Sequence, residues 1–286
     1  SNRSNRDPTG ISARADRSLE SVASALVRKL FTATALTLGA FLMTPIATPL
    51  AAAEPTGQPA GAQAFANGPA KAWLVADLDT GQVLASQDPG GSYAPASTIK
   101  PLLAMVVLDN LRPDALGRAN ESHTKVECSC VGLKPGQVYS VRQLLDALLM
   151  VSGNDAANML ADMLGGQRVT VAAMNRKAAA LGARSTRAGS PSGLDGPGWE
   201  SITTPRDLGV IYRTALTYPV IAEIFRQTSA RFPGKTLTSQ NELLTGYPGD
   251  FAGKTGYTDR DRKTYVGAAQ RGNHRLVVEI GRASCR

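Results

Sequence analysis

The sequence predicts a mixed α/β fold, in which strands near both ends of the chain form one antiparallel sheet and the helices between them form a lobe beside it. Each end of the chain carries a hairpin pattern, two alternating segments joined by a turn that contains glycine. The four expected strands are 71–78, 82–86, 264–270 and 275–280. The region between the two hairpins carries apolar residues at helical spacing.

The first helix is expected to begin near Ser97 and to be buried, because Pro101 suits a first helical turn and residues 102–108 are almost all apolar. Thr204-Pro205-Arg206-Asp207 starts a later helix, with a capping threonine, a proline in the first turn and an acid. Between them, apolar spacing predicts three more helices, at 141–150, 156–164 and 169–181, the last one followed by the stop signal Gly182.

The first 53 residues have the layout of a secretory signal peptide with an upstream segment. Residues 30–44 form an apolar core behind Arg28 and Lys29, and Ala51-Ala52-Ala53 is a small-residue cleavage pattern. An uncleaved anchor is the alternative, because the apolar run is barely long enough to span a membrane. We expect export with cleavage, a linker over 54–70 that is rich in Ala, Gly, Pro and Gln, and a folded catalytic domain over 71–278.

The formal net charge is +8, of which residues 1–53 contribute +3. The remaining excess suits an anionic polymer as partner, but no basic cluster is interleaved with aromatic residues, so nucleic acid is not an expected partner.

Cys128 and Cys130 either form a local disulfide or remain two thiols. With only His123 and His274 in the chain, no metal site is expected.

A serine and a lysine lie one helical turn apart in Ser97-Thr98-Ile99-Lys100, at the start of the apolar helix. Residues at i and i+3 are neighbours on a helix surface, and a buried or crowded lysine loses its proton more easily. Such a lysine can activate a serine without histidine. The second match, Ser122-His123-Thr124-Lys125, has no apolar run behind it, and we expect a solvated loop there.

Two further motifs accompany this pair. Ser152-Gly153-Asn154 falls between two helix patterns, where a hydroxyl and a carboxamide can relay a proton and hold a substrate amide. Taken alone it is more typical of an ordinary helix–helix turn, and Ser239-Gln240-Asn241 fits the same loose pattern. Lys254-Thr255-Gly256 lies just ahead of a strand and suits a carboxylate. A phosphate loop is excluded, because it needs glycine where Pro248 stands.

In this order the three motifs are specific, and the chain resembles the penicillin-recognising serine DD-peptidase and β-lactamase superfamily. Within it, the chain is most similar to actinobacterial D-alanyl-D-alanine carboxypeptidases, the low-molecular-mass penicillin-binding proteins. The stretches 151–158, 191–196 and 253–258 carry the likeness, which runs from Ala72 to Glu279. The resemblance implies an α/β fold with a five-stranded antiparallel sheet, helices on its faces and a helical lobe.

The resemblance also implies a role for each motif. Ser97 is the expected nucleophile, which becomes acylated, and Lys100 is its base. Ser152 and Asn154 are expected to assist proton transfer and substrate placement. The expected substrate-binding residues are Lys254, Thr255, Gly256 and Tyr257, the first two for a terminal carboxylate. The backbone N–H groups of Ser97 and Tyr257 are expected to form the oxyanion hole, and no metal or cofactor is implied.

The implied reaction is removal of the terminal D-alanine from peptidoglycan stem peptides through an acyl-enzyme, with β-lactam antibiotics acting on the same serine. A DD-endopeptidase and a non-catalytic penicillin-binding sensor domain are alternatives. A β-lactamase is a third, for which Glu200 is the only glutamate in the loop region that is a candidate to activate water. The enzyme is expected on the cell-wall side of the membrane, and both membrane association and oligomeric state are left open.

Residues 279–286 depart from the family pattern. The last strand should continue there, but the sequence turns polar abruptly at Glu279, and the eight residues back-translate to the read-through of a common sequencing adaptor. We therefore expect a non-native tail, a catalytic domain truncated after residue 278, and no structural role for Cys285.

Overall fold

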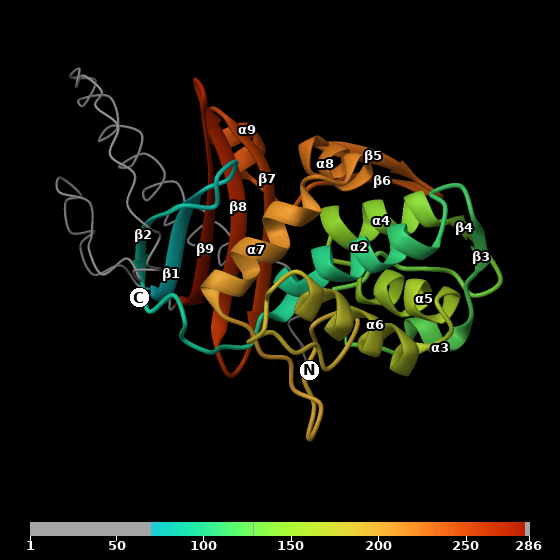
Figure 1. The fold of residues 1–286 in the computed structure, drawn as a ribbon. Coiled ribbons are helices and arrows are strands. Elements are labelled where there is room, and N and C mark those ends of the chain that lie inside the picture. Colours follow the sequence, from blue (N-terminus) through green and yellow to red (C-terminus); the bar gives the residue numbers. More distant parts are fainter. Residues whose placement is uncertain (1–69, 128, 284–286) are drawn as a thin grey trace, which may run out of the picture.

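The structure, a computed structural model, describes residues 70–127 and 129–283. A five-stranded sheet in the order β2-β1-β9-β8-β7, antiparallel throughout, stands beside a helical lobe (Figure 1). Its strands are β1 Ala70–Asp77, β2 Val83–Gln87, β7 Asp250–Thr258, β8 Arg262–Arg271 and β9 His274–Ala283. Because β1 pairs with β9, the first and last strands meet in one sheet, which confirms the predicted fold class.

The four helices predicted from apolar spacing and from the Thr204 motif are confirmed to within a few residues. They are α4 Val141–Met150, α5 Asn154–Met163, α6 Gln167–Ala180 and α7 Pro205–Ala215. The sequence analysis missed the shorter elements of the lobe, which carry too few residues to show a period. These are α3 Glu121–Thr124, α8 Pro219–Arg226, α9 Leu243–Gly246, and the hairpins β3 Leu116–Arg118 with β4 Val138–Ser140 and β5 Ser229–Phe232 with β6 Lys235–Thr238.

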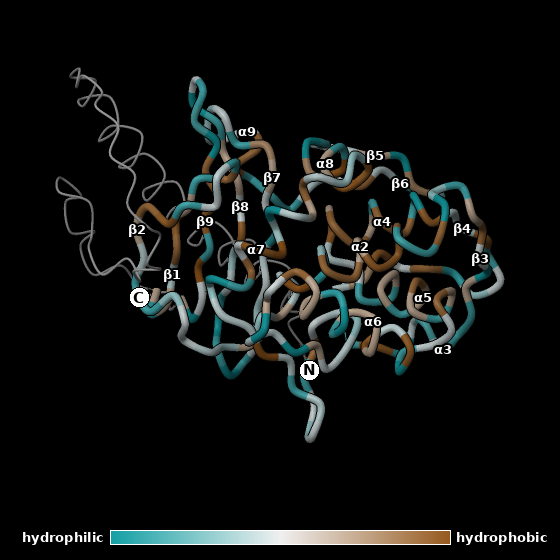
Figure 2. Tube along the Cα trace, viewed as in Figure 1, coloured by the Kyte–Doolittle hydropathy of each residue, from teal (hydrophilic) through white to brown (hydrophobic). Residues whose placement is uncertain are grey.

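The helix that carries the Ser-x-x-Lys motif runs through the middle of the lobe, as predicted, but its start differs from the expectation. Residues Ala96–Ile99 form a 3₁₀ turn, η1, and the α-helix α2 spans Lys100–Asn110 with a proline in its first turn. Every residue from Lys100 to Val107 is buried. Figure 2 shows this helix and α4 as largely hydrophobic segments enclosed by the lobe.

The two faces of the sheet belong to two apolar clusters. On β1, Leu74 and Ala76 pack in the cluster that contains α2, α4 and α7, whereas Trp73 and Val75 pack in a second cluster on the opposite face. Leu243 of α9 belongs to that second cluster. Side chains of a strand alternate between faces, so this pattern is what a strand buried on both sides requires.

No single helix in the described ranges is long and apolar enough to cross a membrane. Only α7 and α8 taken together pass a test of length and composition, and they are bent by 102° relative to each other. Ile211 of α7 and Ile224 of α8 are fully buried in the core of the lobe. The apolar faces of this pair are therefore core faces.

The last strand does not break at Glu279, contrary to the expectation from the sequence. β9 continues to Ala283, and Ile280 and Gly281 lie in register with β1, because backbone pairing does not depend on side-chain polarity. The domain boundary expected at residue 278 therefore falls inside a strand, while the non-native origin of the tail stays a prediction.

Glu279 nevertheless fits this strand poorly. It is fully buried opposite Val266 and Leu74, and neither of its carboxyl oxygens has a hydrogen-bond partner among the described residues. Burial raises the pKa of this carboxyl well above its ordinary value of 4.5. A buried polar group without a partner costs stability, so the position suits an apolar residue better.

We predict that Glu279→Leu raises the free energy of unfolding by about 1–3 kcal/mol, the cost of an unsatisfied buried group. Because the folded state holds a proton that the unfolded state has released above pH 4.5, the parent loses stability as the pH rises toward the folded pKa. The gain from the substitution is therefore larger at pH 8 than at pH 4. Thermal melts of both proteins at the two pH values measure it, and a lower melting temperature for the variant contradicts the prediction.

Candidate active site

The three motifs converge where the lobe meets the sheet. Ser97 lies on η1, Lys100 begins α2, Ser152 lies in the turn before α5, Asn154 begins α5, and Lys254 lies on β7. The sequence analysis had placed Lys254 ahead of a strand, whereas it lies inside β7, the edge strand of the sheet. The site is therefore an assembly of segments that are far apart in the chain.

The nucleophile candidate and its base are in direct contact. The Lys100 Nζ lies 2.7 Å from the Ser97 Oγ, within hydrogen-bond distance. In a 3₁₀ turn, side chains at i and i+3 eclipse, so the η1 turn aligns the two groups. Ser97 is half-buried and Lys100 is fully buried, so the amine is out of water while the hydroxyl remains reachable.

Three other oxygen atoms surround the Lys100 amine. The Ser152 carbonyl is 2.9 Å away, the Ser152 Oγ 3.1 Å and the Asn154 Oδ1 2.7 Å. Together with the Ser97 Oγ they hold the nitrogen in one place. This arrangement confirms that Ser152 and Asn154 lie beside the serine–lysine pair.

Burial lowers the pKa of Lys100 well below its ordinary value of 10.5, and the positive charge of Lys254 lowers it further. The negative charge of Asp155 acts in the opposite direction. A lysine whose pKa is lowered is a neutral amine at a lower pH than usual, and a neutral amine has the lone pair that a base needs.

Lys254 reaches the same site from the sheet. It is buried, and its Nζ donates to the Ser152 Oγ at 3.0 Å and to the Thr255 carbonyl at 2.7 Å. The Ser152 hydroxyl therefore lies between two lysine amines. A hydroxyl that can both donate and accept at this place is suited to pass a proton.

The Asn154 amide has only one orientation that satisfies its neighbours. Its Nδ2 donates to the Glu127 carbonyl at 2.7 Å, and a carbonyl can only accept, so the Oδ1 must face Lys100. The Asn154 backbone N–H donates to the Ser129 carbonyl at 2.7 Å. Residues on both sides of position 128 thus hold the asparagine, which the sequence analysis did not anticipate.

Two glycines allow the close packing around Ser97. A Cβ on Gly256 would lie 3.0 Å from the Ala96 Cβ and 2.4 Å from the Thr264 Oγ1. A Cβ on Gly193 would lie 1.9 Å from the Ala96 carbonyl oxygen. Glycine is thus needed in Lys254-Thr255-Gly256 for β7 to lie against η1, and the stretch 191–196, to which the sequence analysis gave no role, packs against the same turn.

Backbone strain is present at the same place. Ala96 and Ser152 have φ values of +51° and +61°, in the left-handed region that residues with a Cβ seldom adopt. Each costs of order 1–3 kcal/mol and persists only where the surrounding packing enforces it. One precedes Ser97 and the other supplies two of the oxygens around Lys100, so two of the strained positions in the described residues set the site's geometry. The others are Asp88, Arg262 and Arg282.

The remaining candidates divide into those near the site and those outside it. Thr255 is buried beside Lys254, and Tyr257 is 53% exposed, with its hydroxyl bonded to Asp259 and Arg262. The oxyanion hole formed by the Ser97 and Tyr257 N–H groups stays a prediction. The Glu200 carboxylate accepts a hydrogen bond from Gly198 in its own loop, at 3.3 Å.

The second matches to the two serine motifs are not parts of the site. Lys125 is exposed and pairs with Glu121, and Ser122 lies in α3, where its N–H and hydroxyl donate to the Oδ1 of the capping residue Asn120. Ser239-Gln240-Asn241 instead links two parts of the site, because the Gln240 N–H donates to the Met150 carbonyl at 2.9 Å. Asn241 bonds to Asp250 at the start of β7, so this segment connects the turn before Ser152 to the strand of Lys254.

Within the described ranges no group of three or more His, Cys, Asp or Glu residues is placed to hold a metal ion. Cys130 is disulfide-bonded and is therefore not a free thiol, while its pairing with Cys128 stays a prediction. Both Cys128 and Cys285 lie outside the described residues.

Comparison with known proteins agrees with this geometry. The family model described as D-alanyl-D-alanine carboxypeptidase matches residues 59–282. The chain belongs to this family. The matched region includes all three motifs, and it extends past residue 278 into the second half of β9.

Among individual relatives, the chain is 56% identical to D-alanyl-D-alanine carboxypeptidase DacB2 of Mycobacterium tuberculosis over 227 residues, 78% of each chain. It is 34% identical over 210 residues to a D-alanyl-D-alanine endopeptidase of Pseudomonas aeruginosa, covering 70% of this chain and 66% of that one. The crystal structure of a D-alanyl-D-alanine carboxypeptidase from M. tuberculosis superposes with a TM-score of 0.79 at 55% identity, over 80% of this chain and 89% of that one.

We predict that Lys100→Arg lowers the rate of acylation at Ser97 by about 10²-fold or more, since arginine keeps the charge but cannot deprotonate. In the parent the rate rises with pH through the lowered pKa of Lys100, so its acid limb lies below pH 10.5. Stopped-flow labelling with a fluorescent penicillin across the pH range measures the acylation rate of the variant and the position of the acid limb in the parent. Lys125→Arg is the matched control in the second motif and should leave the rate unchanged, whereas near-normal acylation in Lys100→Arg assigns the base to another group.

Proposed function

We propose that the chain is a serine-type D-alanyl-D-alanine carboxypeptidase, a hydrolase that removes the terminal D-alanine from peptidoglycan stem peptides. The observation that carries the mechanism is the 2.7 Å contact between the buried Lys100 amine and the Ser97 hydroxyl. A neutral amine there takes the hydroxyl proton as the oxygen attacks a carbonyl carbon. Penicillins present a carbonyl and a carboxylate in comparable places, so β-lactams acylate the same serine.

The first half of the reaction forms an ester. The Ser97 Oγ attacks the carbonyl carbon between the two D-alanines, and its proton moves to the Lys100 Nζ. The C–N bond then breaks, and the leaving nitrogen receives that proton through the Ser152 hydroxyl, which lies 3.1 Å from the Lys100 Nζ. The products of this half are free D-alanine and an acyl-enzyme.

The second half hydrolyses the ester. Lys100, neutral again, takes a proton from a water molecule as the water oxygen attacks the ester carbonyl. The C–O bond to Ser97 breaks, and the Ser97 Oγ recovers a proton from Lys100, to which it is held by a direct hydrogen bond. The enzyme returns to its starting state, and the shortened peptide leaves.

We assign the binding of the terminal carboxylate to Lys254 and Thr255. The Lys254 amine is buried, lies at the edge strand and is 3.0 Å from the Ser152 Oγ, so a carboxylate there also approaches the proton relay. The endopeptidase alternative rests on a relative that carries that name. The two activities differ in the leaving group, which is free D-alanine for a carboxypeptidase and a second stem peptide for an endopeptidase.

We further propose that the enzyme acts on the cell-wall side of the membrane, where its substrate lies. The signal-peptide layout of residues 1–53 and the disulfide at Cys130 support this, because disulfides persist in oxidising compartments.

The experiment that tests the proposed function offers the enzyme three substrates: a stem pentapeptide, a cross-linked stem dimer and a penicillin. We expect release of D-alanine from the pentapeptide, little cleavage of the dimer and an acyl-enzyme with penicillin at Ser97. Ser97→Ala should abolish turnover and labelling, whereas Ser122→Ala should abolish neither. Cleavage of the dimer alone supports an endopeptidase. Rapid release of hydrolysed penicillin supports a β-lactamase, and labelling without any turnover supports a sensor domain.

We predict that Lys254→Ala lowers pentapeptide cleavage by about 10- to 150-fold, because a hydrogen bond to a charged group contributes about 1.5–3 kcal/mol. Loss of Lys254 also removes a charge that lowers the pKa of Lys100, so both enzymes are compared on the pH plateau above their acid limbs. A pentapeptide amidated at its terminal carboxylate is the control: it should be a poor substrate of the parent and change little in the variant. Equal cleavage of acid and amide by the parent contradicts carboxylate recognition.

A further inference from the structure

Asp155, one residue beyond the Ser-x-Asn motif, has no role in the mechanism above, yet it is almost completely buried next to it. It lies in the first turn of α5. Its two carboxyl oxygens accept four backbone hydrogen bonds. The donors are the N–H groups of Val131 at 2.9 Å, Gly132 at 2.8 Å, Leu133 at 2.9 Å and Ala156 at 2.9 Å.

Three of these four donors belong to a segment that has no regular secondary structure. Residues 129–133 run past the start of α5, and no helix or strand hydrogen bonds hold their backbone. A carboxylate that accepts several N–H groups is the strongest local substitute for such bonds. Asp155 therefore fixes the position of this segment against the helix.

The same stretch of chain holds the catalytic asparagine. The Ser129 carbonyl accepts from the Asn154 backbone N–H, and the Glu127 carbonyl accepts from the Asn154 Nδ2. Ser129 belongs to the segment that Asp155 anchors, so the segment fixes the backbone of Asn154, while Glu127, just outside the segment, orients its amide. A displacement of the segment would shift the Asn154 backbone and with it the Oδ1 atom that contacts Lys100.

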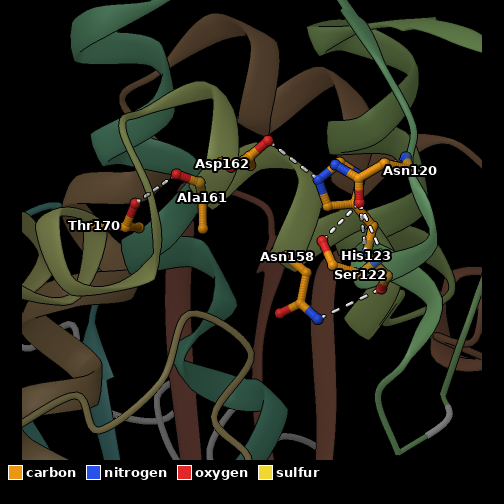
Figure 3. A network of polar contacts seen from close by, with 7 residues as sticks. All are labelled: Asn120, Ser122, His123, Asn158, Ala161, Asp162 and Thr170. Atoms are coloured by element: carbon orange, nitrogen blue, oxygen red, sulfur yellow. Dashed lines mark hydrogen bonds and ion pairs between the residues drawn. The ribbon is translucent and has the colours of Figure 1, made fainter.

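Other contacts anchor the flanks of the segment. Upstream, Figure 3 shows α3 tied to α5: His123 contacts Asp162 at 3.3 Å, and Asn158 donates to the His123 carbonyl at 3.4 Å. On the opposite side, the Lys235 amine of β6 bonds to the Val131 carbonyl. Asp155 is the member of this set that contacts the segment and lies next to Asn154.

Asp155 also supplies negative charge to a site that is otherwise positive. Lys100 and Lys254 are both buried and both contact the Ser152 Oγ. Of the charged groups that act on Lys100, Lys254 on β7 disfavours its ammonium form and Asp155 on α5 favours it. The Asp155 carboxylate therefore offsets part of the unfavourable effect that the Lys254 charge has on the ammonium form of Lys100.

We propose that Asp155 is a positioning residue of this active site, which fixes the backbone position of Asn154 through residues 129–133 and balances the charge of the Lys100–Lys254 pair. The proposal rests on the proposed acyl-enzyme at Ser97. It assigns to one buried carboxylate two effects that an experiment can separate, one on geometry and one on charge.

The test is the pH dependence of acylation by a fluorescent penicillin in the parent and in Asp155→Asn. An asparagine keeps the size but loses the charge, and its amide hydrogens oppose the backbone donors. We expect the plateau rate to fall by about 10²-fold, the cost typical of a misplaced catalytic group. We also expect the acid limb to move to lower pH, because the charge that favoured the Lys100 ammonium is lost.

Two control variants distinguish this role from general loosening of the fold. Asp162→Asn removes a carboxylate of the same helix that does not touch the segment, so the acid limb should not move. Lys235→Met loosens Val131 from the other side and keeps Asp155, so the rate should fall while the limb does not move to lower pH. An Asp155→Asn variant that is acylated like the parent, or one whose acid limb stays in place, overturns the proposal.

If Asp155→Asn does not fold, amide hydrogen exchange of the parent tests whether Asp155 holds the segment in place. The N–H groups of Val131, Gly132 and Leu133 should exchange as slowly as those within α5, and rapid exchange overturns the proposal. Failure of the proposed function is a separate result, because it appears as an absence of labelling at Ser97 in the parent itself.

Discussion

The site depends on one lysine amine that is held out of water. Four oxygen atoms from three residues fix the Lys100 nitrogen, and its helix is buried from Lys100 to Val107. Removing a charged amine from water is expensive, and the cost is reduced when the group gives up its proton. Because Lys100 is buried, its amine is neutral at a lower pH than that of an exposed lysine, and its lone pair lies beside the Ser97 hydroxyl without the help of a histidine.

The fold provides this environment through close approaches between backbones. The edge strand β7 can lie against the turn before Ser97 only because Gly256 has no side chain, and Gly193 packs on the same turn from another loop. The positive φ values of Ala96 and Ser152 show that the turns themselves are bent into unfavourable conformations. Packing from both the lobe and the sheet compensates for that strain, so the geometry of the site is a property of the whole domain.

The sequence predicted the parts of this structure that follow from periodicity and from motif chemistry. The apolar run after Lys100 predicted the buried helix, and the two hairpin patterns predicted a sheet that joins the chain ends. The role of Asp155 was not predicted, because its partners are backbone N–H groups more than twenty residues away that no side-chain pattern marks. The continuation of β9 past Glu279 was also missed. Backbone hydrogen bonds between strands form at Glu279 even though its buried carboxyl group has no hydrogen-bond partner among the described residues.

The pairing of β1 with β9 has a consequence for how the molecule forms. The edge of β1 that pairs with β9 stays uncovered until β9, the last strand in the chain, has formed. The strand β7, which carries Lys254, also lies in the C-terminal part of the chain. Contacts between such distant segments make folding slow, because a long loop must close before they form. A nascent chain therefore has no complete binding site until almost all of it is available.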